Sequence, residues 1–159
     1  MGLLLILRMS GGGWALDLSS LYTQVILEHN KNKENRREIE GYTHKERGHN
    51  PSCGDDITVE AIIEDNIIKD LAYTGHGCSI SQASASMMAE LLMGKTVEEA
   101  LDTIEVFLGM IKREINDTEY LEDVLDEASI LQGISNLPAR VKCAVLAWHA
   151  LKEAITNKE

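Results

Sequence analysis

The stretch Ile57–Tyr73, which reads ITVEAIIEDNIIKDLAY, decides the fold class because it holds two strand patterns around one turn. From Ile57 to Ala61 apolar and polar residues alternate, which is the period-two pattern of a half-buried strand. Asp65-Asn66 has the composition of a tight turn, and the run after it favours a returning strand. The stretch therefore predicts an antiparallel hairpin.

Helical patterns flank this hairpin on both sides. A Ser19 or Ser20 cap favours a first helix, Gly94 favours the end of a second, and Thr96 begins a capping box for a third. Residues 117–132 are acidic and favour a loop with a short helix, while Ile39 and Tyr42 suggest a short extra strand. We expect one α+β domain in which a small antiparallel sheet packs against several helices. The main predicted helices are Leu21–His29, Ile80–Leu91, Val97–Ile111 and Pro138–Ile155.

The chain length of 159 residues fits a single domain. Residues 1–16 combine five consecutive aliphatic residues with a glycine run, which is too short for a membrane span and lacks a signal-peptide pattern. We expect residues 1–16 to be a disordered or non-native extension and residues 17–159 to form the domain. We also expect no membrane association.

Charge and cysteine content narrow the function classes. Fifteen basic and 26 acidic residues give a net charge of −11, which disfavours nucleic-acid binding. Three cysteines cannot all pair within one chain and are too few for a disulfide scaffold. A reducing, cytoplasmic location is therefore expected, in which cysteines more often bind metals or carry thiol chemistry.

All three cysteines lie near the beginning of a predicted element. Cys53 precedes the first strand, Cys78 precedes a helix, and Cys143 lies in the second turn of the last helix. A helix N-terminus favours a thiolate, the form that binds zinc or iron. In an extended segment Cys53 and Asp55 would face the same way, so the four side chains could complete a Cys₃Asp site. Arg140 would share the helix side of Cys143 and lower the pKa of its thiol.

Spacing alone leaves other interpretations open. Free cysteines are often simply buried, and Asp55 by itself is typical of a turn. His76, within a glycine junction beside Cys78, is a candidate ligand or neighbour of the site. We interpret Met87 and Met88 as packing residues and the acidic face from Asp117 to Glu127 as solvated.

Three motifs in order resemble those of the SufU/IscU/NifU N-terminal family of iron–sulfur cluster assembly proteins. They are Asn50–Asp55 (NPSCGD), Gly75–Ser86 (GHGCSISQASAS) and Leu137–Cys143 (LPARVKC). Leu21-Tyr22 and the segment from His29 to Asn32 are also similar to the family, and coverage runs from about Asp17 to the C-terminus. Asn30 and Lys33 depart from its H-Y-K-N-P stretch.

The form of the third motif is similar to the SufU branch. The IscU branch carries a histidine directly before the third cysteine, where this sequence has Lys142, and it lacks an insertion that residues 116–136 resemble. The resemblance implies Zn²⁺ ligation by Cys53, Asp55, Cys78 and Cys143. It further implies that Cys53 accepts persulfide sulfur from a pyridoxal-phosphate-dependent, SufS-like cysteine desulfurase, a histidine of which replaces Cys53 on the metal.

In the same scheme Arg140 pairs with the released Asp55, and the sulfur passes to a downstream scaffold or acceptor. An alternative is a scaffold that assembles a [2Fe–2S] cluster, or binds iron, on the same residues. A structural zinc module is a third hypothesis, and a dithiol redox role is disfavoured because no C-x-x-C motif is present.

Overall fold

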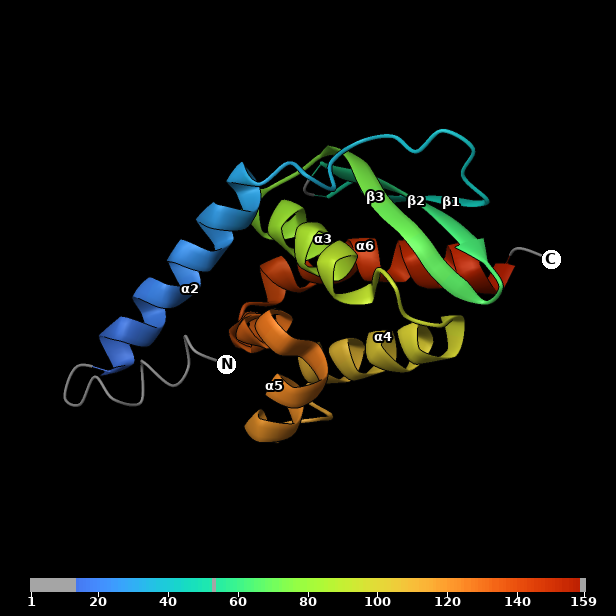
Figure 1. The fold of residues 1–159 in the computed structure, drawn as a ribbon. Coiled ribbons are helices and arrows are strands. Elements are labelled where there is room, and N and C mark those ends of the chain that lie inside the picture. Colours follow the sequence, from blue (N-terminus) through green and yellow to red (C-terminus); the bar gives the residue numbers. More distant parts are fainter. Residues whose placement is uncertain (1–13, 53, 158–159) are drawn as a thin grey trace.

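A three-stranded antiparallel sheet, ordered β1-β2-β3, forms one layer of the molecule, and helices cover one of its faces (Figure 1). The computed structural model describes residues 14–52 and 54–157. Helix α3 packs against β3 and helix α6 packs against β1 and β2, so the predicted α+β class is confirmed. The elements are α2 (Trp14–Lys31), β1 (His44–Asn50), β2 (Asp55–Glu64), β3 (Ile67–His76), α3 (Ser79–Leu92), α4 (Val97–Ile111), α5 (Thr118–Leu125), the 3₁₀ helix η1 (Asp126–Asn136) and α6 (Pro138–Asn157).

The predicted hairpin is the β2–β3 pair. Asp65 and Asn66 both have positive φ, 53° and 66°, as the two central residues of a type I′ turn require. The second strand continues to His76, three residues beyond its predicted end. A short extra strand was expected near Ile39 and Tyr42, but the third strand, β1, begins only at His44, and its sequence HKERGHN contains no apolar side chain that could indicate its course. Its inner side instead brings Gly48 against Leu146 of α6, where an added Cβ would lie 3.1 Å from Leu146 Cδ1.

The helix boundaries follow local signals with two corrections. The capping box at Thr96, the end of α3 before Gly94 and the first-turn position of Pro138 are confirmed. The first helix begins at Trp14, so a cap at Ser19 or Ser20 is wrong and residues 14–16 are helical. The rest of the predicted N-terminal extension, residues 1–13, lies outside the described residues.

Buried contacts fix the two central helices to each other. The Ser84 hydroxyl of α3 donates to the Ala144 carbonyl of α6 at 2.6 Å and accepts from Trp148 Nε1 at 2.8 Å. Trp148 also stacks on Phe107 of α4, with ring centroids 3.9 Å apart. These contacts set the position of α6 relative to α3 and so determine which side chains of the two helices can meet.

Segment 116–136 folds into α5 and η1, which contact α4, and η1 also contacts α3 and α6 (Figure 1). Leu121, Leu125 and Leu131 are fully buried in the common core. The segment is therefore a packed part of the domain. Among the described helices, none is long and apolar enough to cross a membrane.

Candidate metal centre

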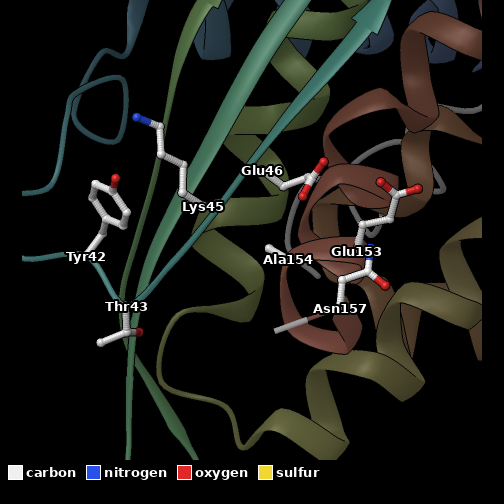
Figure 2. Close-up of a pocket in the computed structure, with 7 residues that line it drawn as sticks. All are labelled: Tyr42, Thr43, Lys45, Glu46, Glu153, Ala154 and Asn157. Carbon is white, nitrogen blue, oxygen red and sulfur yellow. The ribbon is translucent and has the colours of Figure 1, made fainter. Parts of the chain in front are cut away.

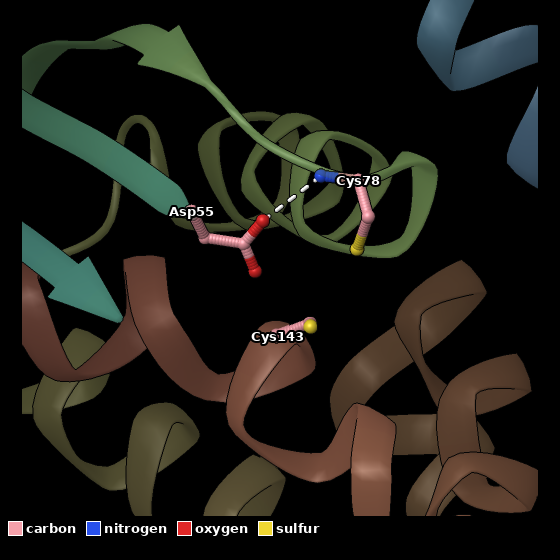
Figure 3. Close-up of side chains that lie close together, drawn as sticks. All are labelled: Asp55, Cys78 and Cys143. Carbon is pink, nitrogen blue, oxygen red and sulfur yellow. Dashed lines mark hydrogen bonds between the residues drawn. The ribbon is translucent and has the colours of Figure 1, made fainter. Parts of the chain in front are cut away.

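Asp55, Cys78 and Cys143 come together where β2 begins, α3 begins and the second turn of α6 lies. One potential ligand atom from each lies within 4.8 Å of the others (Figure 3). The sequence singled out all three, although they are separated by 23 and then 65 residues. Cys53, the fourth residue of the predicted set, lies outside the described residues.

Asp55 is completely buried and its carboxylate is held by the backbone of α3. Its Oδ1 accepts a hydrogen bond from the Cys78 N–H at 2.9 Å (Figure 3). Burial of an ionised carboxylate is costly unless hydrogen bonds and positive charge compensate for the lost water. A cation at this position would supply that charge.

Cys78 is the N-cap residue of α3 and is only partly buried. Its backbone is extended (φ −71°, ψ 171°), so the chain turns into the helix directly after it. The N–H groups of the first helical turn place partial positive charge at this end of α3. Cys78 is therefore positioned as an accessible ligand at a helix start.

Gly77 permits the close approach of these groups. A Cβ added there would lie 2.6 Å from Asp55 Oδ1 and 2.3 Å from Ser81 Oγ. Gly75 is under a separate constraint, since its φ is 115° and an added Cβ would lie 1.9 Å from the Asp56 carbonyl oxygen. The glycines around His76 therefore serve the geometry of the strand-to-helix junction.

Cys143 faces the cluster from the buried side of α6, with 1% of its surface exposed. The hydrogen bonds of Ser84 to Ala144 and Trp148 fix the adjacent helical turn. The thiol position is thus determined by the core packing of α6. The predicted location of Cys143 in the second helical turn is confirmed.

Arg140 lies beside the two thiols, as its position three residues before Cys143 predicted. Attraction to Cys78, followed by a hydrogen bond and attraction to Cys143, raises the pKa of Arg140 above its ordinary value. Tyr22 of α2 is close to the same charges, and burial raises the pKa of its phenol. The guanidinium therefore places a permanent positive charge at the edge of the cluster.

The donor set fits zinc. Two thiolates and a carboxylate are common Zn²⁺ ligands, and tetrahedral bonds of about 2.3 Å would put the sulfurs about 3.8 Å apart. The present spread of up to 4.8 Å requires only small side-chain adjustments. One further donor would complete four-coordination. The same donors also bind iron, so the geometry is compatible with either metal.

The segment before Asp55 was expected to be extended, but Gly54 has φ 76° and its N–H donates to the Asn50 carbonyl, so the backbone turns at Gly54. The predicted orientation of Cys53 lies outside the described residues. The neighbouring Ser52 hydroxyl donates to Asn50 Oδ1 at 2.8 Å. The described residues of the NPSCGD motif on either side of Cys53 therefore form turn structure that leads into β2.

His76 does not join this cluster. It is exposed at the end of β3, where it pairs in register with Asp56. Met87 and Met88 are buried in the core, as predicted. Lys142 is exposed, so the residue directly before Cys143 supplies no buried ligand.

His29 is a buried residue with two side-chain partners, which the sequence pattern did not indicate. It is 6% exposed, its Nδ1 lies 2.8 Å from Ser86 Oγ, and its Nε2 lies 2.5 Å from Glu127 Oε1. Glu127 belongs to the acidic face that was interpreted as solvated; its side chain is 39% exposed and also pairs with His29. His29 follows the buried Val25 and Ile26 by four and three residues, which is the helical spacing that could have indicated its burial.

A cavity of about 410 Å³ lies well away from the cysteines, between the start of β1 and the C-terminal turns of α6 (Figure 2). Glu46 and Glu153 border it on one side, and Tyr42 and Lys45 border it on the other (Figure 2). Lys45 lies over the Tyr42 ring at 5.1 Å and 3.5 Å from Glu60. None of the candidate ligands lines this cavity.

The fold and the cluster together define a class of small α+β proteins that gather two thiols from helices and a carboxylate from the start of a strand. The family model for the NifU-like N-terminal domain matches residues 21–159. The chain belongs to this family, which includes the iron–sulfur cluster assembly proteins IscU and SufU. The family resemblance of the three motifs is thereby confirmed.

Individual relatives are similar over most of their length. The zinc-dependent sulfurtransferase SufU of Bacillus subtilis is 39% identical over 144 residues, covering 90% of this chain and 95% of the relative. The iron–sulfur cluster assembly scaffold protein IscU of Thermotoga maritima is 42% identical over 135 residues, covering 85% and 92%. One relative is named a sulfurtransferase and the other a scaffold, so sequence similarity alone does not decide between these two activities.

A solved structure agrees with the fold. A protein from Fervidobacterium islandicum, described as a scaffold for the SUF system, superposes with a TM-score of 0.78 at 36% identity. The match covers 83% of this chain and 94% of the other. The similarity in fold therefore extends over most of both chains.

Proposed function

We propose that this chain is a zinc-dependent sulfur acceptor for a cysteine desulfurase in iron–sulfur cluster biogenesis. The observation that carries the proposal is the convergence of Asp55, Cys78 and Cys143 within 4.8 Å, beside Arg140. Cys53, which lies two residues before Asp55, is the proposed fourth ligand. The proposed functional unit is the domain over residues 17–159.

Each residue has a distinct part in this proposal. Cys78 and Cys143 hold Zn²⁺ as anionic ligands, one at a helix start and one in the core. Asp55 is the exchangeable oxygen ligand, and Arg140 can hold its carboxylate when it leaves. Bound zinc keeps the Cys53 thiol deprotonated and protected until the partner arrives.

The transfer step balances without an external oxidant or reductant. The Cys53 thiolate attacks the outer sulfur of the persulfide on the desulfurase. A bond forms between Cys53 Sγ and that sulfur, the S–S bond of the donor breaks, and the donor cysteine leaves as a thiolate. The sulfur then goes to a downstream scaffold or acceptor by the same type of exchange.

The experiment combines metal analysis with desulfurase turnover in one preparation. Protein purified without oxygen is expected to contain one zinc in the cysteine site, to show no iron–sulfide absorbance and to stimulate a SufS-like desulfurase. Cys53→Ser should remove most of the stimulation, whereas Ser52→Ala, a neighbour outside the ligand set, should keep it. Full stimulation by Cys53→Ser would contradict the sulfur-acceptor proposal and favour a structural zinc module.

A scaffold for a [2Fe–2S] cluster is the second candidate, and the scaffold names of several relatives favour it. Lys142 argues for the sulfur acceptor. The IscU branch carries a histidine at this position, directly before the third cysteine, and this chain has an exposed lysine there. Reconstitution with iron and sulfide separates the two. A stable cluster that passes intact to an acceptor protein would favour the scaffold.

A further inference from the structure

A second group of ligand-type side chains lies at the other end of α3, away from the cysteines. His29 of α2, Glu90 of α3 and Glu127 of η1 each offer one ligand atom, and these atoms lie within 4.8 Å of one another. Three separate elements contribute them. The family comparison and the proposed function assign no role to this group.

His29 is prepared for metal binding by its other ring nitrogen. His29 is only 6% exposed, and its Nδ1 lies 2.8 Å from the Ser86 hydroxyl. In the tautomer that carries its proton on Nδ1, Nδ1 donates to the Ser86 hydroxyl. The lone pair of Nε2 then faces the carboxylates and is available to a cation. A hydrogen bond to the second ring nitrogen is the usual way in which proteins orient a metal-binding histidine.

The two carboxylates face each other at short range. Burial raises the pKa of Glu90, and the nearby charges of Glu127 and Glu34 add to this effect while His29 opposes it. Asn32 Nδ2 donates to Glu90 Oε2 at 3.2 Å and holds this side chain. Two adjacent carboxylates in a chain of net charge −11 attract a cation that neutralises both.

A proton now fills the place that a metal could take. Although burial opposes it, the hydrogen bond and attraction of Glu127, together with Glu90 and Glu28, raise the pKa of His29. The Nε2–Oε1 distance of 2.5 Å must widen to about 3.4 Å to accommodate a tetrahedral cation with bonds of about 2.1 Å. Glu127 is 39% exposed at its side chain, so it has room for this movement.

We propose that His29, Glu90 and Glu127 form a second divalent-cation site that takes Zn²⁺ through one imidazole nitrogen and two carboxylate oxygens. Water fills the remaining coordination positions, because two of the three ligands face the surface. A bound ion joins α2, α3 and η1, and so attaches segment 116–136 to the two helices that it meets there. The site is independent of the function proposed for the cysteines.

Zinc titration against a chromophoric chelator tests the proposal on the full-length protein with the cysteine site already filled. The wild type is expected to bind a second equivalent and to melt at a higher temperature when it does. Glu90→Gln should weaken this second equivalent at least tenfold. Glu119→Gln removes an exposed acidic charge from the same segment as Glu127 and should leave it unchanged.

Cobalt distinguishes the two sites by their spectra, since thiolate ligands give strong charge-transfer bands that nitrogen and oxygen ligands lack. The first Co²⁺ equivalent should show these bands, and the second should add only weak visible absorption that Glu127→Gln removes. Absence of a second equivalent in the wild type would overturn the proposal and leave His29–Glu127 as an ion pair. Equal binding by Glu90→Gln and Glu119→Gln would overturn it as well.

Discussion

The two ends of α3 carry ligand-type side chains in opposite electrostatic settings. At its start, Cys78 lies among free backbone N–H groups and the Arg140 guanidinium, which stabilise anions. Near its end, Glu90 lies in the negative field of the helix C-terminus, which favours cations. One helix thus stabilises thiolates at one end and favours a positive charge on or beside His29 at the other.

The two ends also differ in how rigidly they are built. The cysteine end is fixed by buried contacts, including the Asp55 carboxylate on the Cys78 N–H and the Ser84 link to α6. The histidine end has one buried member and two partners at the surface. We therefore expect stronger metal binding at the cysteine end and easier ligand movement at the histidine end.

The largest expected effect is the loss of zinc from the cysteine end. Cys143→Ser removes one of the two described thiol ligands, so zinc affinity there should fall by at least about a hundredfold. Competition with a chelator of known affinity measures it. Glu127→Gln is the matched variant at the histidine end of α3, and it should leave the affinity for the first zinc equivalent unchanged. An equal loss of affinity in both variants would contradict the distinction between the two ends.

Ser84→Ala should lower the free energy of unfolding by about 1–3 kcal/mol. It leaves the Trp148 indole N–H without its acceptor in the core. Urea unfolding of the zinc-free protein measures the change. Ser135→Ala removes a half-buried hydroxyl that bonds only locally, to the Gln132 carbonyl, and should cost less. A similar cost for both variants would show that Ser84 does not fix α3 to α6.

The glycines that flank α3 provide the third test. Gly77→Ala places a methyl group against Asp55 and Ser81, so it should destabilise the fold by about 1–3 kcal/mol and weaken metal binding at the cysteine end. Gly94→Ala has open space around it and only the strain of φ 92°, so it should cost about 1 kcal/mol without changing metal binding. Thermal melting and zinc titration measure both effects. Unchanged zinc affinity in Gly77→Ala would show that the site adapts.

The smallest effect is expected from an ion pair outside both ends. The hydrogen bond from Arg37 lowers the pKa of Asp70, so this pair stabilises the fold above the ordinary carboxyl pKa and less as the pH falls through the lowered value. Arg37→Ala should therefore cost about 1 kcal/mol or less at pH 7 and less still near pH 3. Melting temperatures at the two pH values measure it. A cost that grows on acidification would contradict this sign.

Sequence reasoning recovered the features that depend on neighbouring residues. The hairpin turn at Asp65-Asn66, the capping box at Thr96 and the first-turn Pro138 are all local signals, and all are present. The three clustered ligands were found because residue type, element position and family motifs agreed. The resemblance, rather than spacing, selected them from the ordinary buried residues.

The structural features that sequence reasoning missed include two that depend on residues far away in the chain. The burial of His29 is completed by Glu127, which lies 98 residues away in the chain. Strand β1 has no apolar pattern, because its contact with α6 uses the absent side chain of Gly48. Gly54, just before Asp55, turns with φ 76° where an extended backbone was expected, and its N–H donates to the nearby Asn50 carbonyl. At His29 and β1 tertiary packing decides the local structure, whereas the Gly54 turn is a local feature.

The polar sequence of β1 has a consequence for solubility. Within the described part of the chain β1 pairs only with β2, so its other edge offers backbone groups to any passing strand. Exposed Lys45, Arg47 and His49 alternate along it, and no apolar side chain accompanies them. An incoming strand would have to bring its own side chains against the charged Lys45 and Arg47 and remove these two cations from water. The strand thus protects the sheet from edge-to-edge aggregation.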